Sequence, residues 1–204
     1  MKPVWRWPEL VFEVLPIVLL SFGLTLAGDL WSATKLSRAH TVSLWICLVG
    51  IYAALMVFKA ARGWNLGLLG IFSLLVGATL TSWLPGGAPS RWAALCVVGG
   101  LTTACGVVGL SLRTGFKWPV RLFWAASLPY LIGWLILVVW QVGARWLGMW
   151  AGLGVLLFGG LTIGWFAAWR TLPHGPSGTA SAIDLYLLTA SMGLAVMVLL
   201  ANSL

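Results

Sequence analysis

Seven long apolar segments dominate the 204-residue chain, and each has about the length of a helix that crosses a lipid bilayer. A spanning helix needs roughly 20 mostly apolar residues, because each residue advances the helix by about 1.5 Å. The segments cover residues 10–28, 41–58, 64–84, 92–112, 120–141, 146–169 and 180–201. The links between them are too short to hold a separate domain. The sequence therefore predicts a single transmembrane domain over residues 1–204, an all-α bundle of seven helices.

The composition supports a membrane location. Apolar residues make up 61% of the chain and charged residues 8%, whereas soluble domains are about 45–50% apolar and about 25% charged. A soluble fold of this size could not bury so much apolar surface, and a disordered chain would contain far less of it. We therefore expect an integral membrane protein whose main partner is the lipid bilayer.

The basic residues indicate the orientation of the chain. The net charge of +8 is spread singly or in pairs between the apolar segments, which excludes a nucleic-acid partner and is typical of the loops of membrane proteins. If the N-terminus is inside, the inner links hold eight basic residues: Lys2, Arg6, Lys59, Arg62, Arg113, Lys117, Arg121 and Arg170. The outer links hold four: Lys35, Arg38, Arg91 and Arg145. We expect a plasma (inner) membrane protein that keeps its first segment, with a cytoplasmic N-terminus and an external C-terminus.

Tryptophan and glycine predict how the bundle is anchored and packed. Most of the 15 Trp residues, including Trp45 and Trp169, lie near segment ends, where indole rings prefer the headgroup level. Trp134 and Trp165 fall deeper. Three pairs of glycines four residues apart indicate close helix packing; they are Gly63/Gly67, Gly148/Gly152 and Gly160/Gly164. Because the sixth segment carries most of these glycines, we expect it to be the central helix.

Only four carboxylates are present in the chain. Glu9 and Asp29 flank the first segment, which indicates interfacial positions. Glu13 lies about one turn inside the first segment and Asp184 about one turn inside the last. A charge at mid-depth of a bilayer costs at least about 2.5–3.5 kcal/mol, so the last two acids are the informative ones.

Two interpretations of Glu13 and Asp184 remain open. In the first, both are acids in the first turn of a helix, where the helix dipole favours a negative charge. In the second, they form a carboxylate pair, or each pairs with Lys59 or Arg62, and the group lines an ion pathway and titrates with pH. In the predicted topology both helices begin on the cytoplasmic side, so the two acids are expected at similar depth.

No pattern of catalytic or metal-binding residues is present in the sequence. The two histidines, His40 and His174, fall in links on opposite sides of the membrane and cannot share a metal. The cysteines lie inside apolar runs without metal or disulfide spacing, and no nucleophile elbow or phosphate-binding loop occurs. Ser and Thr within the segments are expected to hydrogen-bond their own helix. We therefore expect no enzymatic activity, no cofactor and no bound metal.

Three stretches of the chain resemble a known family. Residues 65–80, NLGLLGIFSLLVGATL, follow a basic turn and end in a Gly-x-Thr-Leu step. Residues 102–117 combine TTACGVVG with a basic turn, and residues 182–188 read AIDLYLL. In this order the stretches resemble the third, fourth and last helices of the transmembrane Bax inhibitor motif family. The resemblance implies a bundle of six helices around a central one that acts as a pH-sensitive calcium leak.

The chain departs from this family at the gate. In the family, two aspartates on the last two helices share a proton and close the pore. Here Leu188 stands at the last-helix position and Trp165 at or beside the sixth-helix position. Asp184 lies one turn before the expected acid. The resemblance thus implies a leak for calcium or another cation with a diverged gate, in which Asp184 and Glu13 form the polar end of the pathway and Trp165 plugs the usual site of the aspartates.

A second hypothesis comes from a different class of protein. Few polar residues lie within the segments, whereas glycine and tryptophan are abundant. Such faces suit packing against other membrane subunits, so the chain is alternatively a structural subunit of a larger membrane complex without transport of its own.

Overall fold

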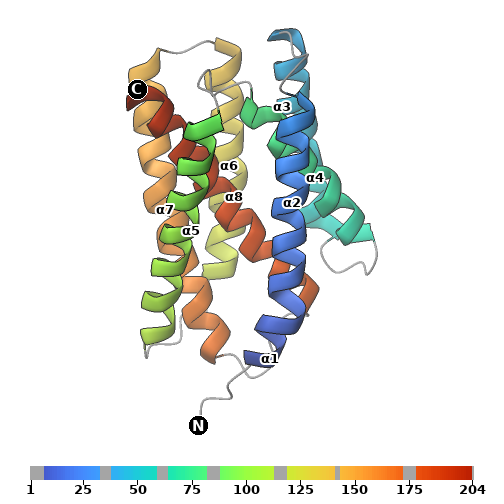
Figure 1. The fold of residues 1–204 in the computed structure, drawn as a ribbon, viewed down its shortest axis with the longest axis vertical. Coiled ribbons are helices and arrows are strands. Elements are labelled where there is room, and N and C mark those ends of the chain that lie inside the picture. Colours follow the sequence, from blue (N-terminus) through green and yellow to red (C-terminus); the bar gives the residue numbers. More distant parts are fainter. Residues whose placement is uncertain are drawn as a thin grey trace.

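The computed structural model of the protein is a bundle of helices (Figure 1). It describes residues 7–32, 38–58, 64–81, 88–112, 119–140, 143–171 and 178–203. The long helices are α2 (Leu15–Ser32), α3 (Arg38–Phe58), α4 (Trp64–Thr81), α5 (Ala88–Ser111), α6 (Pro119–Trp140), α7 (Ala144–Thr171) and α8 (Gly178–Ser203). A short helix α1 (Trp7–Glu9) and a π-helical turn η1 (Leu10–Val14) lead into α2. The long helices match the seven apolar segments to within a few residues, which confirms the all-α prediction.

The outside of the bundle is apolar. Three described helical stretches are long and apolar enough to cross a membrane, Leu10–Leu30, Arg145–Trp169 and Gly178–Leu200. The shorter apolar stretches are Val42–Leu55, Trp64–Thr79, Cys96–Ser111 and Ala125–Leu137. Large hydrophobic side chains such as Phe12, Leu19, Trp64 and Leu156 are exposed. A surface of this kind suits contact with lipid rather than water.

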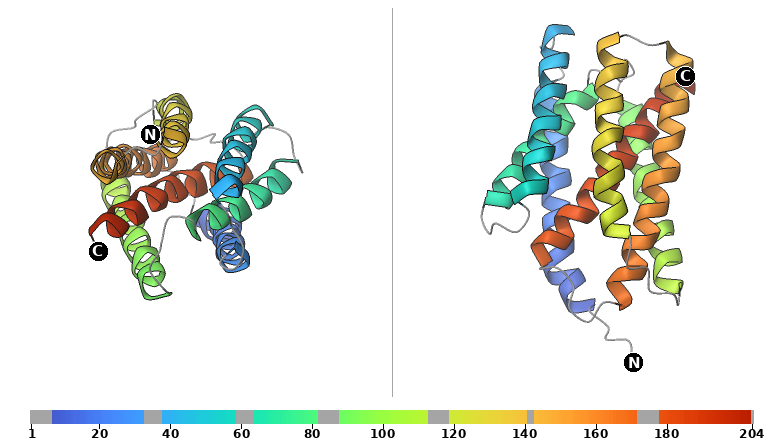
Figure 2. Two further views of the ribbon diagram at one scale, coloured as in Figure 1. Left: turned by 90° about the horizontal axis from the view of Figure 1, so that it is seen from above. Right: turned by 180° about the vertical axis from the view of Figure 1, so that it is seen from behind.

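The long helices form two groups of three with α8 between them (Figures 1 and 2). In the N-terminal group, α4 packs on both α2 and α3; in the C-terminal group, α7 packs on both α5 and α6. Viewed from above, α8 runs obliquely between the two groups and contacts helices of both (Figure 2). Within the described residues, α3 and α6 make the only extensive direct contact between the groups.

The central helix is α8, and the expectation that the sixth segment is central was wrong. Every residue of α8 from Ala180 to Val198 is buried. In contrast, α7 exposes large side chains such as Met149, Leu153 and Leu156. A glycine-rich face indicates that one neighbour approaches closely, whereas a central position requires neighbours on all sides.

Glycine brings helices into direct contact, but at other positions than the predicted pairs. A Cβ on Gly28 would overlap the backbone carbonyl of Leu74, and a Cβ on Gly77 would overlap that of Thr25. These two contacts join α2 to α4 backbone to backbone. Helices α5 and α7 meet in the same way at Gly109.

The predicted glycine pairs mostly face outward. A Cβ on Gly67, Gly152 or Gly160 would meet no other atom within 4 Å. Gly63 lies outside the described residues. The spacing of two glycines shows that they share a helix face, but it does not show whether another helix covers that face. The prediction of close packing at these positions was therefore wrong for the three that can be assessed.

Tryptophan occurs both inside the bundle and on its surface. The Trp45 and Trp134 rings stack across the α3–α6 contact with centroids 6.4 Å apart, and the Trp165 and Trp169 rings stack at 5.2 Å. Trp45 and Trp169 are buried, so the prediction that they belong to the anchoring belt was wrong. A position near the end of a segment does not show whether a side chain faces lipid or the interior of the bundle. Among the side chains that the structure describes, three tryptophans are exposed and fit the belt; they are Trp64, Trp140 and Trp146.

We predict that Gly77→Ala destabilises the protein, whereas Gly67→Ala in the same helix does not. The new methyl group at position 77 would overlap the Thr25 carbonyl, and overpacking of this kind costs about 1–3 kcal/mol. At position 67 the methyl group has open space. Thermal unfolding of the purified protein in detergent measures both effects. Equal melting temperatures for the two variants would contradict the close α2–α4 contact.

Candidate functional site

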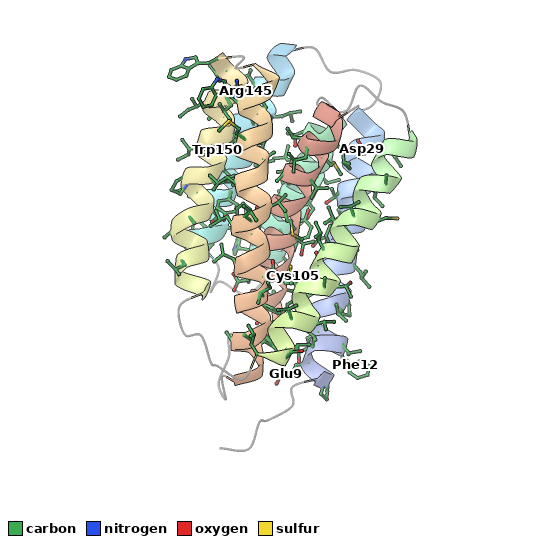
Figure 3. All side chains as sticks on the ribbon, turned by 90° about the vertical axis from the view of Figure 1, so that its left-hand side faces the viewer. Glu9, Phe12, Asp29, Cys105, Arg145 and Trp150 are labelled. Carbon is green, nitrogen blue, oxygen red and sulfur yellow. The ribbon has the colours of Figure 1, made fainter. Side chains whose placement is uncertain are left out.

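Asp184 is the one completely buried carboxylate among the four in the chain. It lies in α8, six residues after the start of the helix at Gly178. Glu9 is half-buried and Glu13 is exposed. Asp29 lies near the end of α2 but is also buried, which the prediction of an interfacial position missed. Glu9 and Asp29 lie at opposite ends of the bundle (Figure 3).

A tyrosine hydroxyl lies on the side of Asp184 that faces the α3–α6 contact. The hydroxyl group of Tyr52 in α3 donates a hydrogen bond to the Oγ atom of Ser127 in α6. The same hydroxyl is close enough to the Asp184 carboxylate to interact with it electrostatically. Tyr52 and Ser127 are fully buried. The Tyr52–Ser127 pair thus lies within electrostatic range of Asp184 in an apolar interior, where such interactions are stronger than in water.

A second hydroxyl cluster lies on the side of α8 that faces the N-terminal group. The Tyr186 hydroxyl oxygen is 2.6 Å from Thr25 Oγ1 in α2. Because Thr25 uses its single proton to bond the Ser21 carbonyl oxygen at 2.9 Å, Tyr186 is the donor. Ser73 of α4 lies near Tyr186 and donates its own hydrogen bond to the Leu69 carbonyl oxygen at 2.7 Å. The Tyr186 ring meets Phe22 edge-on with centroids 5.4 Å apart.

The helical spacing separates these two clusters around α8. Asp184 and Tyr186 are two residues apart and so lie about 200° apart around the helix axis. Ser181, Leu188 and Ser191 share the Asp184 face, and all three are buried. Leu188 lies one turn beyond Asp184 on the same face. The position at which the resembled family has an aspartate is therefore apolar here. The carboxylate on this face of α8 is that of Asp184.

Trp165, the other position that replaces the family's paired acids, lies in the interior. It is buried in α7, stacks on Trp169 and meets Phe166 edge-on at 5.0 Å between centroids. It belongs to the same hydrophobic core as Leu188. Both positions are thus occupied by apolar packing residues.

Glu13 contacts the beginning of α8. An added Cβ on Gly178 would overlap the Glu13 carboxylate and lie 2.8 Å from its Cβ atom. Glu13 is part of η1, where the Leu15 N–H bonds the Leu10 carbonyl oxygen, five residues back. Pro16 follows directly; it cannot donate a backbone hydrogen bond and its ring crowds the preceding turn, which explains the wider turn here.

The structure does not bring Glu13 and Asp184 together as a pair. Glu13 lies at the first residue of α8, whereas Asp184 is six residues, or about 9 Å, further along the helix axis. The contact with Gly178 gives Glu13 the place at a helix N-terminus where the dipole favours a negative charge. This geometry agrees with the first-turn interpretation of Glu13. Asp184 lies deeper than that interpretation requires.

The predicted basic partners cannot be placed beside these acids. Lys59 and Arg62 lie outside the described residues. Arg145, near the beginning of α7, is exposed at the end of the bundle opposite Glu9 (Figure 3). Among the residues that the structure describes, no three His, Cys, Asp or Glu side chains come together as metal ligands.

Sequence reasoning missed the hydroxyl groups around Asp184. Many Ser and Thr side chains do bond their own helix, as predicted; Thr102 and Thr162 bond the carbonyl oxygens four residues back. The available signal was tyrosine. The chain has three tyrosines, and all lie inside apolar segments, where a phenolic hydroxyl needs a partner from another helix.

Comparison with known proteins identifies no family for the chain. No protein-family model matches the sequence, and no curated protein is significantly similar to it. The resemblance to the transmembrane Bax inhibitor motif family therefore remains a hypothesis.

We predict that the Tyr186 and Thr25 hydroxyls stabilise the protein jointly. In a double-mutant cycle with Tyr186→Phe and Thr25→Val, either single variant removes the same interhelical hydrogen bond. The double variant should then lose less unfolding free energy than the two single variants lose together. The difference should be about 0.6 kcal/mol and at most about 1.7 kcal/mol. Unfolding free energies in detergent or bicelles measure the coupling. Additive effects would show that the 2.6 Å contact contributes nothing to stability.

Proposed function

We propose that the chain is a membrane-embedded bundle that lets cations, calcium among them, leak passively, with Asp184 as the acidic group on their route. The observation that carries this proposal is the complete burial of Asp184 in the central helix. An ionisable side chain within a membrane helix costs free energy. Such side chains face the interior of the bundle and mark the pathways of ions, protons or substrates.

The surroundings of Asp184 suit a cation. Hard cations such as Ca²⁺ bind carboxylate, carbonyl and hydroxyl oxygens. Asp184 supplies a carboxylate, and the bonded pair Tyr52 and Ser127 supplies hydroxyl oxygens within its electrostatic range. One carboxylate and two hydroxyls make a weak site, which favours passage of an ion over tight retention. A leak is therefore a better match than a structural cation site.

The family resemblance supports the same function. The transmembrane Bax inhibitor motif family implies a bundle of six helices around a central one, and α8 is the central helix here. Asp184 lies one turn from Leu188, where that family has one of its two aspartates. The proposed protein is thus a diverged member in which one acid of the central helix takes over from a pair of acids and Trp165 fills the remaining space.

The proposed topology has seven spans, with the N-terminus in the cytoplasm and the C-terminus outside the inner membrane. Glu9 and the end of α8 lie at opposite ends of the bundle (Figures 1 and 3), as an odd number of passes requires. Asp29 and Arg145, both assigned to the outer side, lie at the same end (Figure 3). The excess of basic residues in the inner links gives the direction.

We predict that reporter fusions place the two ends of the chain on opposite sides of the membrane. Green fluorescent protein fused to the N-terminus should fluoresce, because it folds in the cytoplasm. Alkaline phosphatase fused to the C-terminus should be active, because it requires the external side. A non-fluorescent fusion at the N-terminus, or an inactive phosphatase fusion at the C-terminus, would contradict the seven-span topology.

We predict that Asp184→Asn lowers calcium flux into proteoliposomes by about tenfold or more. The substitution keeps the shape of the side chain but removes the charge, and with it an interaction worth about 1.5–3 kcal/mol. Flux is measured with an enclosed calcium dye at pH 6 and pH 8. We expect the response to pH in the wild type to be lost in the variant.

The matched control is Asp29→Asn, the same change at the chain's other aspartate. Asp29 is buried near the end of α2, away from the middle of α8, so its substitution should leave the flux within about twofold of wild type. Wild-type protein without flux at either pH would remove the leak hypothesis. Equal flux in wild type and Asp184→Asn would reduce Asp184 to a structural residue.

The alternative function, a structural subunit without transport, is favoured by a separate observation. Gly67, Gly99, Gly100, Gly152 and Gly160 have open space where a Cβ would be, so another helix could approach these faces closely. Extraction in a mild detergent separates the two hypotheses. Other chains in fixed stoichiometry favour the subunit, and a lone monomer favours the leak.

A further inference from the structure

The contact between α3 and α6 differs from the other contacts within the bundle. It joins the N-terminal and C-terminal groups directly, whereas the remaining connection between them runs through α8. Two interactions that the structure describes close it: the stacked rings of Trp45 and Trp134, and the hydrogen bond from Tyr52 to Ser127. We refer to these four residues as the α3–α6 seam.

Side chains close the seam, whereas backbone contacts close one interface inside each group, α2–α4 and α5–α7. In the N-terminal group the α2 and α4 backbones touch at Gly28 and Gly77, and in the C-terminal group α5 and α7 touch at Gly109. Tightly packed backbones cannot separate without losing many contacts at once. A stacked ring pair and one hydrogen bond can part more easily, so relative motion of the two groups is concentrated at the seam.

A proline in α6 adds a second reason to expect motion there. Pro129 lies inside the helix, two residues after Ser127. It has no N–H to donate to the carbonyl of Ala125, and its ring crowds that carbonyl, so the helix lacks one hydrogen bond at this point. Sharp bends in helices occur at such prolines. The α6 side of the seam is thus the part of the helix best able to bend.

Tyr52 connects the seam to the buried acid. Its ring is held in the N-terminal group by Phe72 of α4, with centroids 5.9 Å apart. Its hydroxyl reaches Ser127 in the C-terminal group and also interacts with the Asp184 carboxylate. Separation of α3 from α6 would therefore break the bond to Ser127 and uncover Asp184 in the same step.

We propose that the α3–α6 seam is the gate of the route to Asp184, with the Tyr52–Ser127 hydrogen bond as the contact that holds it shut. This inference rests on the proposed leak function, in which ions have to reach Asp184. In the closed arrangement Tyr52 and Ser127 cover the carboxylate. In the open arrangement the two groups part along the seam and water reaches the Asp184 face of α8.

The test measures access of water to the Asp184 face rather than ion flux. Ser181 is fully buried one turn before Asp184 on the same face, and Ser181→Cys changes one atom. Cys47, Cys96 and Cys105 are replaced by alanine in the full-length protein. The reagent is a charged, membrane-impermeant methanethiosulfonate, which reacts only with a thiol in contact with water. The rate at which the reagent labels this thiol is measured on protein in lipid nanodiscs.

We expect Tyr52→Phe to increase the labelling rate about 2- to 12-fold, the range that corresponds to the loss of one net hydrogen bond of about 0.5–1.5 kcal/mol. Ser127→Ala removes the same bond from the other side and should have a similar effect, which guards against a folding defect in either variant. Thr162→Val is the control for the loss of a buried hydroxyl. The Thr162 hydroxyl bonds the Phe158 carbonyl oxygen of its own helix, α7, at 2.7 Å, so its loss should leave the labelling rate unchanged.

The outcome separates the gate from the leak. Faster labelling in Tyr52→Phe and Ser127→Ala, but not in Thr162→Val, supports the gate. Equal rates in all variants, including no labelling at all, overturn it even if the protein conducts. Flux is then compared in the same variants without the added thiol. Faster labelling without any flux leaves the gate standing and refutes the leak.

Discussion

The arrangement of the whole bundle depends on the burial of α8. Helices of both groups surround it, so each polar atom on it must find a partner inside the protein. The polar side chains on the other helices meet this requirement from opposite sides. Thr25 and Ser73 lie near Tyr186 on one side, while Tyr52, bonded to Ser127, interacts electrostatically with Asp184 on the other. The polar side chains of α8 thereby determine at which positions the surrounding helices need a hydroxyl group as a partner.

Two kinds of helix contact divide the bundle into firm and soft parts. Glycine lets α2 meet α4 and α5 meet α7 at backbone distance, and these pairs form the two groups. Between the groups, rings and hydroxyls meet across α3 and α6, next to the buried acid. A membrane protein that passes ions needs an arrangement of this kind, because a uniformly close-packed bundle offers no route and a uniformly loose one offers no closure.

Much of the fold could be predicted from the sequence, and much less of the site. Segment length and hydropathy determine where helices begin and end, and the seven helices follow the seven predicted segments. Spacing shows which residues share a helix face but not what covers it, so Gly67 and Gly152 were assigned to packing and Trp45 to the surface. The central position of α8 is a property of the assembled bundle. Glu13 and Asp184 were recognised as informative acids, but their separate surroundings depend on how α8 packs. Lys59 and Arg62 fall outside the described residues, so their predicted role stays a prediction.

The central claim, that cations reach a carboxylate buried in the middle of α8, can be tested on that carboxylate itself. The chain contains two aspartates, Asp29 and Asp184, so the Asp29→Asn variant with ¹³C-labelled aspartate carries a single labelled carboxyl group. Its infrared band is recorded in lipid nanodiscs while calcium is added. We predict that the band shifts as calcium is added and returns on chelation. A band that stays in place at saturating calcium would contradict the account.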